Sequence, residues 1–121
     1  MNPNKILAVD DDRTLLQLLS NELSNEGYDV ARAYDGTEAL ETLKKKQFDL
    51  VILDIQMPKM NGLDALKLIK EKYPKTKVIM LTAYADIANA LESKRLGADG
   101  FIDKPYDLIE LLTTINRTLT D

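Results

Sequence analysis

The 121-residue chain contains neither cysteine nor histidine. The lack of cysteine excludes disulfides, thiolate catalysis and Cys-ligated metals. The lack of histidine removes the commonest general base, the commonest transition-metal ligand and any phosphohistidine on this chain. What remains is carboxylate chemistry, which suits hard cations such as Mg²⁺.

The sequence also has no long apolar run and no excess of positive charge. No run approaches the ~20 apolar residues of a membrane span, and Met1–Lys5 has no signal-peptide pattern. We therefore expect a cytoplasmic protein without membrane contact. The 20 acidic residues outnumber the 16 basic ones, for a net charge of −4, which argues against direct nucleic-acid binding through phosphate neutralisation. The run Lys44–Lys46 fits a solvated helix end better than a nucleic-acid patch.

The length and composition fit one ordinary globular domain, which we expect to span residues 1–121. Apolar residues make up 45% of the chain and charged residues 30%, as is usual for globular proteins. A chain of this size buries roughly two-thirds of the surface that its unfolded form exposes, so it can form a real core.

The run Leu50–Leu53 leads directly into Asp54, and a loop punctuated by Pro58 and Gly62 follows. A continuous apolar run bounded by turn signals predicts a strand buried on both faces, as in a parallel sheet. Ligands of open α/β sheets bind beyond the carboxyl ends of the strands. Asp54, at such an end, is therefore a candidate for chemistry.

Apolar runs and helical spacing predict the remaining elements. Four further strands are expected at Lys5–Val9, Tyr28–Ala33, Val78–Leu81 (ending at Thr82) and Gly100–Ile102. Five helices are expected at Arg13–Glu26, Asp35–Lys46, Gly62–Lys72, Asp86–Gly97 and Asp107–Leu119. Asp35, Asn61, Asp86 and Asp107 are the expected N-caps. The residues expected to face the core include Leu15, Leu16, Leu19 and Leu23 in the first helix and Ile87, Ala90 and Leu91 in the fourth.

Strict alternation of strands and helices predicts an α/β fold with right-handed crossovers. We expect a five-stranded parallel sheet of order 2-1-3-4-5 with helices on both faces, that is, a flavodoxin-like (βα)5 arrangement. The second strand alternates more in polarity than the first and should lie nearer a sheet edge. An all-α fold would need residues 50–53 and 78–81 to be helical, and both runs are too short.

Four of the five predicted strand ends carry a chemically useful side chain. Asp10 and Asp11 follow the first strand, Asp54 ends the third, Thr82 ends the fourth and Lys104 follows the fifth. In the expected strand order the acids converge, and clustered carboxylates raise one another's pKa unless a divalent cation relieves them. Oxygen ligands with room for waters favour Mg²⁺. With a lysine and a hydroxyl beside it, such a site suits phosphoryl transfer.

Each of these residues also has a structural interpretation. Asp10–Asp12 would serve as a cap for the first helix, Thr82 as a strand-end cap, Lys104 as an exposed loop residue and Asp54 as a turn residue. Independent accidents rarely place complementary groups at four strand ends, so their joint occurrence favours a site.

Four segments resemble the motifs of a known family, and the likeness extends over essentially the whole chain. They are Ile6–Asp12, Asp49–Pro58, Leu81–Ala83 and Asp103–Pro105, and they resemble response-regulator receiver domains of two-component signalling, in particular single-domain chemotaxis-type receivers. The resemblance implies that Asp54 accepts a phosphoryl group from a phosphohistidine of a sensor histidine kinase or histidine phosphotransfer protein. It also implies a signalling role instead of an enzymatic one, with the domain assisting its own phosphotransfer and dephosphorylation.

The resemblance also implies roles for the residues around Asp54. Asp11 would bind Mg²⁺ directly, Asp10 mainly through water, and the backbone carbonyl of Gln56 would be a further ligand. Lys104 would contact the phosphoryl oxygens. Asp12, which stands where the family often has an acid, is not expected to be a ligand.

The same resemblance implies a conformational switch made of Thr82 and Phe101. Thr82 would move to hydrogen-bond the phosphoryl group, and Phe101 would occupy the position of the family's switch aromatic. Tyrosine is frequent there, so Phe101 departs mildly from the pattern by lacking a hydroxyl. By analogy, the fourth helix, fifth strand and fifth helix would form the signalling surface.

Gln56 and Tyr84 each follow a strand end by two positions and are expected at the rim of the site. Gln56 can hydrogen-bond a water and help to place it for attack on an acyl phosphate. Tyr84 is bulky and would shield the phosphoryl group from water. The alternative is that Tyr84 packs on its loop without affecting the rate.

Two other functions are compatible with parts of the sequence. Asp10–Thr14 matches the Asp-x-Asp-x-Thr opening of haloacid-dehalogenase-type phosphatases, but the chain is short for that fold, and Asp103 and Asp107 are poor substitutes for its late acidic pair. A receiver-shaped interaction module that is never phosphorylated is the third possibility, against which Asp54, Thr82 and Lys104 argue.

Overall fold

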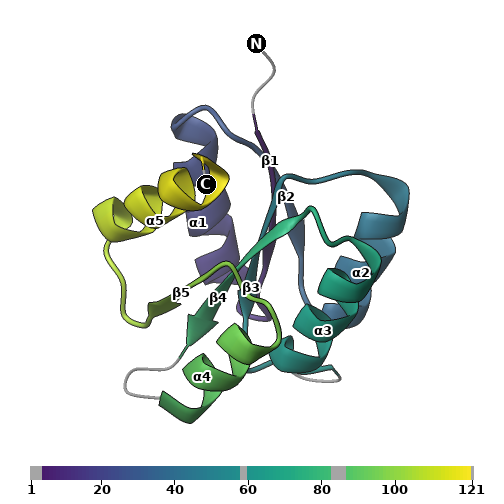
Figure 1. The fold of residues 1–121 in the computed structure, drawn as a ribbon. Coiled ribbons are helices and arrows are strands. Elements are labelled where there is room, and N and C mark those ends of the chain that lie inside the picture. Colours follow the sequence, from purple (N-terminus) through teal and green to yellow (C-terminus); the bar gives the residue numbers. More distant parts are fainter. Residues whose placement is uncertain (1–3, 58–59, 83–86, 121) are drawn as a thin grey trace.

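The computed structural model describes residues 4–57, 60–82 and 87–120 (Figure 1). In these residues five strands alternate with five helices. Their bounds are β1 Lys5–Val9, α1 Arg13–Asn25, β2 Asp29–Ala33, α2 Gly36–Lys45, β3 Leu50–Asp54, α3 Gly62–Lys72, β4 Lys77–Thr82, α4 Ile87–Arg95, β5 Gly100–Asp103 and α5 Leu108–Thr120.

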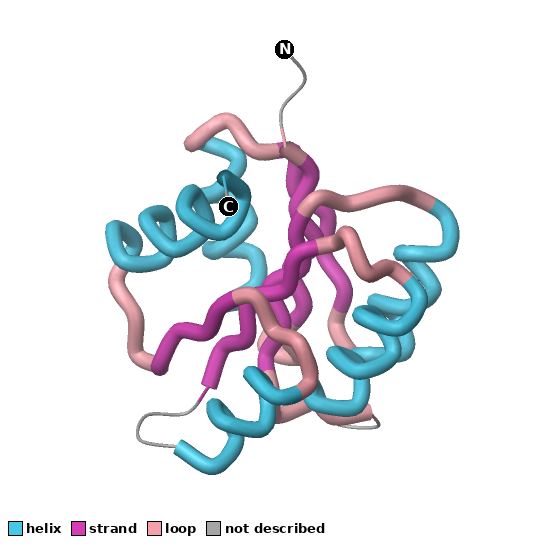
Figure 2. The backbone as a smooth tube through the Cα atoms, viewed as in Figure 1, coloured by secondary structure: helices cyan, strands magenta, loops and turns pink. Residues whose placement is uncertain are grey.

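The five strands form one parallel sheet of order β2-β1-β3-β4-β5. Helices α1 and α5 cover one face, and α2, α3 and α4 cover the other (Figure 1). Figure 2 shows the strands enclosed between helices on both sides. The flavodoxin-like fold and strand order predicted from the sequence are confirmed.

The core follows from the two-residue period of the strands. Ile6 and Ala8 of β1 pack in the layer under α1 and α5, whereas Leu7 and Val9 pack in the layer under α2 and α3. Every residue of β3 is buried, because a central parallel strand is covered on both faces. β2 is a sheet edge, and four of its five residues keep some exposure, as its alternating sequence predicts.

The helix starts show how local sequence sets the element bounds. Asp12, Asp35, Asn61 and Asp107 each accept, through a side-chain oxygen, a hydrogen bond from the backbone N–H three residues later, at 2.7 to 3.1 Å. Such caps satisfy N–H groups that lack a partner within the helix. The caps predicted at Asp35, Asn61 and Asp107 are confirmed, and Asp86 lies outside the described residues.

Two predicted core residues are instead exposed. Leu15 is 53% exposed and Leu91 is 64% exposed. Successive helical residues point about 100° apart, so in α1 Leu15 turns away once Leu16 has turned inward. The small residues Ala90 and Ser93 are buried in α4. The side chain of Ile87 lies outside the described part of the chain.

Candidate functional site

Three carboxylates meet at the carboxyl edge of the sheet. β1 and β3 are neighbours in register, with Val9 opposite Leu53, so the residues that follow these partners are Asp10 and Asp54. One carboxylate oxygen from each of Asp10, Asp11 and Asp54 lies within 4.8 Å of the others. Asp10 and Asp54 are buried and Asp11 is exposed, so the cluster opens to solvent on one side.

Lys104 is the cation nearest this cluster among the described residues. Its Nζ lies 2.8 Å from Oδ2 of Asp54 and 3.9 Å from Oδ2 of Asp10. Its backbone N–H donates to the carbonyl of Thr82 at 2.7 Å, which fixes the residue against the end of β4. Among the residues that the structure describes here, one ammonium group therefore stands beside three carboxylates, which leaves an excess of negative charge.

The pKa of Asp10 is raised from 3.8 to about 6, mainly by burial and also by the charges of Asp54 and Asp11. The backbone N–H of Asp12, which donates to Oδ1 of Asp10 at 3.0 Å, and the charge of Lys104 act in the opposite direction. The penalty of desolvating the carboxylate outweighs both. Oxygen-only donors with this uncompensated charge are consistent with a site for a hard divalent cation.

Asp12 has a different role from the two acids before it. Its side chain caps α1 by accepting from the N–H of Leu15 at 3.1 Å. The capping interpretation therefore holds for Asp12, whereas Asp10 and Asp11 join Asp54 in the cluster.

Asp54 is held in place from the backbone as well as by Lys104. The backbone N–H of Gln56 donates to Oδ1 of Asp54 at 3.2 Å. The first residue of α3, Gly62, packs so closely that a Cβ there would lie 2.3 Å from the carbonyl oxygen of Asp54. The N–H of Gly62 donates to the carbonyl of Ile55 at 2.7 Å. The chain after β3 therefore returns to buttress the backbone of Asp54.

The side chain of Gln56 is exposed beside the acidic cluster. Gln56 and Asp11 both line a surface hollow that Asn61 and Asn89 also border. The predicted rim position of Gln56 agrees with this placement. Tyr84, its proposed counterpart, lies outside the described residues.

Thr82 ends β4 and is fully buried. Its hydroxyl donates to Oδ1 of Asp103 at 2.9 Å, and the carbonyl of Ile102 lies 3.5 Å away. Asp103 is the partner of Thr82 in the β4–β5 register. The hydroxyl thus bonds towards β5, an arrangement that the strand ends alone do not reveal.

Phe101 lies two residues before Asp103 on the same face of β5, and its side chain is 46% exposed. Its partner in the neighbouring strand is Met80, two residues before Thr82. Both members of the predicted switch therefore lie on one face of two adjacent strands.

Two aromatic residues near the site were not recognised from the sequence. The guanidinium carbon of Arg13 lies 3.8 Å from the ring centroid of Tyr34, a cation–π contact at the end of β2. Tyr106 is partly buried beside α1 and α5, and burial, followed by the charge of Asp10, raises its pKa. The position of Tyr34 directly after the second strand could have predicted the cation–π contact with Arg13.

Residues 6–116 match the family model described as the response regulator receiver domain. The chain belongs to this family, the receiver domains of two-component systems. It is 44% identical over 116 residues to the transcriptional regulatory protein CpxR of Escherichia coli K12, covering 96% of this chain and 49% of CpxR. It is 38% identical over 116 residues to the regulatory protein AtoC of the same organism, covering 25% of AtoC. The chain thus spans half or less of these curated relatives.

Solved structures of similar length have the same fold. The chemotaxis protein CheY4 of Vibrio cholerae superposes with a TM-score of 0.91 at 37% identity, covering 96% of this chain and 98% of that one. A CheY-like receiver domain protein from Methanospirillum hungatei gives a TM-score of 0.93 at 36% identity, covering 98% and 94%. Among the described residues, none of the helices has the length and apolar character needed to cross a membrane.

Proposed function

We propose that this chain is a phosphorylation-activated signalling switch, with residues 1–121 forming one receiver domain. Asp54 accepts a phosphoryl group from a phosphohistidine of a sensor histidine kinase or a histidine phosphotransfer protein. The observation that carries the proposal is the setting of the Asp54 carboxylate. It is buried at a strand end, within 4.8 Å of Asp10 and Asp11 and 2.8 Å from the Lys104 ammonium.

In the proposed transfer, an oxygen of Asp54 forms a bond to phosphorus while the bond between phosphorus and the donor imidazole nitrogen breaks. The imidazole leaves with the electron pair and takes up a proton. Lys104 balances negative charge on the phosphoryl oxygens, which is the main need in phosphoryl transfer. The protein is itself the acceptor, so the role is that of a phosphoacceptor that assists its own phosphorylation and dephosphorylation.

Mg²⁺ is the proposed cofactor. Asp10, Asp11, Asp54 and the backbone carbonyl of Gln56 are its proposed ligands, with Asp11 binding directly and Asp10 mainly through water. Their oxygen atoms and the excess negative charge match the preference of this ion. When bound, it supplies charge neutralisation that a single lysine cannot provide.

The position of Asp12 favours this proposal over a phosphatase. In the Asp-x-Asp-x-Thr interpretation, Asp10 would be the nucleophile and Asp12 the second acid of the motif. The Asp12 carboxylate is instead engaged as the cap of α1, and Asp54 has the lysine partner that a phosphoryl acceptor needs.

The test is labelling with acetyl phosphate and Mg²⁺, with the modified residue located by mass spectrometry. Wild type should gain one phosphoryl group on Asp54, and Asp54→Asn should gain none. Asp12→Asn is the matched control, because it removes a neighbouring carboxylate and keeps a capping side chain, and it should label as wild type does. Turnover of a phosphoester retained in Asp54→Asn would support a phosphatase, and absence of label in wild type would support an unphosphorylated interaction module.

Two residues are proposed to set the lifetime of the phosphorylated state. Gln56 would place the attacking water and Tyr84 would exclude it. Tyr84→Ala should shorten the lifetime several-fold and Gln56→Ala should lengthen it, measured as decay in excess Mg²⁺ without a kinase. An unchanged or slower decay in Tyr84→Ala contradicts the shielding role.

Phosphorylation is proposed to move Thr82 and Phe101 together. The new phosphoryl oxygens offer the Thr82 hydroxyl an acceptor, and its movement opens space for the ring of Phe101. The resulting surface would signal to a downstream partner or output domain. We propose a cytoplasmic location for the domain, with no membrane contact and no direct contact with nucleic acid.

A further inference from the structure

The hydroxyl of Thr82 has a single proton to donate. In the structure that proton is directed to Oδ1 of Asp103 at 2.9 Å, whereas the Ile102 carbonyl at 3.5 Å is at the limit of a hydrogen bond. A neutral hydroxyl bonded to a carboxylate forms one of the stronger hydrogen bonds in a protein. The unphosphorylated domain therefore already provides Thr82 with a good partner on β5.

This contact competes with the proposed switch. A phosphoryl group on Asp54 offers oxygens to the same hydroxyl, and one proton cannot serve both acceptors. Thr82 must leave Asp103 before it can bond the phosphoryl group. The equilibrium between the two orientations of Thr82 therefore depends on how strongly Asp103 holds it.

We propose that Asp103 is a positioning residue that holds Thr82 away from Asp54 and so sets how readily the domain switches. The inference rests on the proposed phosphorylation of Asp54 and adds a residue that opposes it. Asp103 acts through Thr82 and does not itself touch the reacting atoms.

The surroundings suit this role. Thr82 is fully buried, so water does not replace Asp103 freely as a partner. Asp103 pairs directly with Thr82 in the β4–β5 register, and the next residue, Lys104, contacts Asp54 at 2.8 Å. Asp103 also shares a face of β5 with Phe101. Release of Thr82 from Asp103 should therefore affect both the acidic cluster, through Lys104, and the exposed ring of Phe101.

Substitutions at Asp103 separate its hydrogen bond from its charge. Asp103→Ala removes both, whereas Asp103→Asn removes the charge and keeps a carbonyl acceptor for Thr82. Since Asp103 is exposed, both variants should fold. A phosphoryl mimic binds to the molecules in which Thr82 has already left Asp103. The apparent dissociation constant therefore falls in proportion as the fraction of such molecules rises.

The experiment is a titration of the full chain with beryllofluoride, a mimic of the phosphoryl group, in the presence of Mg²⁺. The loss of one charge-assisted hydrogen bond in Asp103→Ala should lower the apparent dissociation constant about tenfold. Asp103→Asn, which keeps a weaker neutral bond, should lower it only about threefold. In the ligand-free Asp103→Ala protein, the NMR signals of the β5 amides should already lie towards their beryllofluoride-bound positions.

A double-mutant cycle with Thr82→Ala measures the coupling between Asp103 and the Thr82 hydroxyl. If Asp103 only supported the local structure, this coupling would be absent. Without the hydroxyl, Asp103→Ala should change the dissociation constant by less than about 1.5-fold, because nothing remains for Asp103 to hold. Equal effects in both backgrounds, equal effects of the Asn and Ala variants, or an unchanged constant in Asp103→Ala would each overturn the role of Asp103. Failure of the wild type to bind beryllofluoride with Mg²⁺ would instead reject the proposed function itself.

Discussion

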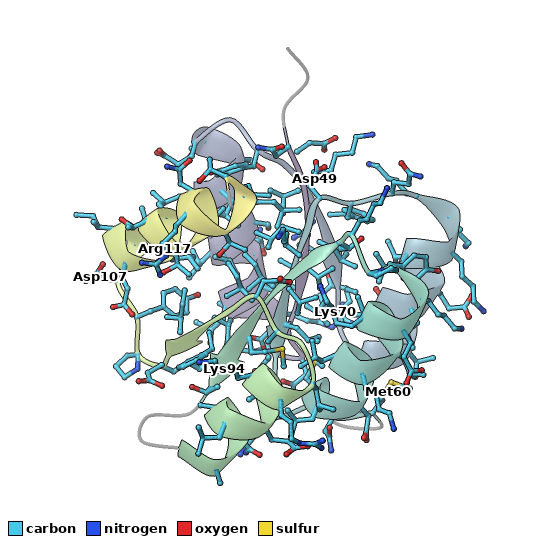
Figure 3. The ribbon with its side chains drawn as sticks, in the orientation of Figure 1. Asp49, Met60, Lys70, Lys94, Asp107 and Arg117 are labelled. Atoms are coloured by element: carbon cyan, nitrogen blue, oxygen red, sulfur yellow. The ribbon has the colours of Figure 1, made fainter. Side chains whose placement is uncertain are left out.

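The two edges of the sheet treat charge in opposite ways. At the amino edge, Asp99 accepts hydrogen bonds from Lys70 Nζ at 3.0 Å and from the backbone N–H of Val78 at 2.9 Å. Asp49 accepts from the backbone N–H of Lys5 at 2.8 Å. Figure 3 shows Asp49 near the top of the view, where β3 begins. Each of these acids is matched by donors, and Asp49 borders a broad surface hollow that Lys5 and Lys77 also line.

At the carboxyl edge, the described carboxylates are not matched by an equal number of cations. One carboxylate oxygen from each of Asp10, Asp11 and Asp54 lies within 4.8 Å of the others. In the part of the chain that the structure describes, Lys104 is the cation that pairs with them, through Asp54 and Asp10. At the amino edge, charged side chains fix loops and strand starts, whereas the acidic cluster at the carboxyl edge is consistent with a metal site. Uncompensated buried charge costs stability, and its presence indicates a site shaped by function. The contrast can be tested by breaking each edge in turn.

The largest effect is expected from a methyl group at the carboxyl edge. In Gly62→Ala the new Cβ would meet the carbonyl oxygen of Asp54 at 2.3 Å and Cα of Ile55 at 2.6 Å. Backbone atoms cannot move aside as a side chain can, so the variant should lose about 3 kcal/mol of unfolding free energy. Urea unfolding measures this loss.

Gly27 at the amino edge provides the control. It has a φ of 96°, and a Cβ there would meet nothing within 4 Å. Gly27→Ala should therefore cost only the backbone strain of this conformation, about 1 kcal/mol. Equal losses in the two variants would show that Gly62 does not buttress Asp54 as described.

The second effect is the gain in stability on binding Mg²⁺, because folding brings the three carboxylates together. At ~100 times the dissociation constant, Mg²⁺ should raise the unfolding free energy by about 2.7 kcal/mol. Asp11→Ala should abolish most of this gain and leave the metal-free protein folded, since it relieves repulsion. Thermal unfolding with and without Mg²⁺ tests both statements.

Asp12→Ala is the matched control for the metal effect. It should lose about 1 kcal/mol of helix-cap stability yet keep the gain from Mg²⁺. A wild-type melting temperature that is indifferent to Mg²⁺ contradicts the proposed metal site.

The third effect concerns Asp99 at the amino edge of the sheet. Asp99→Ala leaves the N–H of Val78 and the ammonium of Lys70 without this acceptor and should lower the unfolding free energy by about 2 kcal/mol. Asp99→Asn keeps an acceptor and should cost roughly half as much. Neither variant should alter the response to Mg²⁺, and a change in that response would mean that the two edges are coupled.

The smallest effect is the pH dependence that Asp10 gives to the metal-free protein. Its folded pKa is raised from 3.8 to about 6, so between these values the folded state binds more protons than the unfolded state. Stability from this group is complete below about pH 4 and is lost as the pH rises through about 6. As the pH rises from 4 to 7, the unfolding free energy of Asp10→Asn should therefore increase by about 1 to 2 kcal/mol relative to that of the wild type.

Urea unfolding in the presence of a chelator measures this difference. Asn at position 10 keeps an acceptor for the N–H of Asp12, which limits the change to the charge. Mg²⁺ favours the ionised carboxylate, so adding it should remove the difference. A difference that is constant across pH contradicts the raised pKa of Asp10.

The sequence by itself determined the fold and the meeting of carboxylates from two strand ends at one edge of the sheet. Apolar runs such as Leu50–Leu53 are too short for helices and too continuous for an exposed strand, so they require a sheet covered on both faces. Parallel strands bring their carboxyl ends to one edge, and this brings Asp10 and Asp54 together whatever the loops do. Caps such as Asp35 and Asn61 depend on neighbours three residues away and are local by nature.

The tertiary structure decided which of several similar residues does what. Asp10 and Asp12 are equivalent in sequence, and the turn after β1 sends the first into the cluster and the second to the cap of α1. Leu15 is as apolar as Leu16, and the rotation of α1 on the sheet exposes it. The sequence likewise does not predict the hydrogen-bond partner of Thr82, because its hydrogen bond to Asp103 forms only when β4 and β5 pair in register. Such contacts join residues far apart in the chain, and only packing brings them within reach of one another.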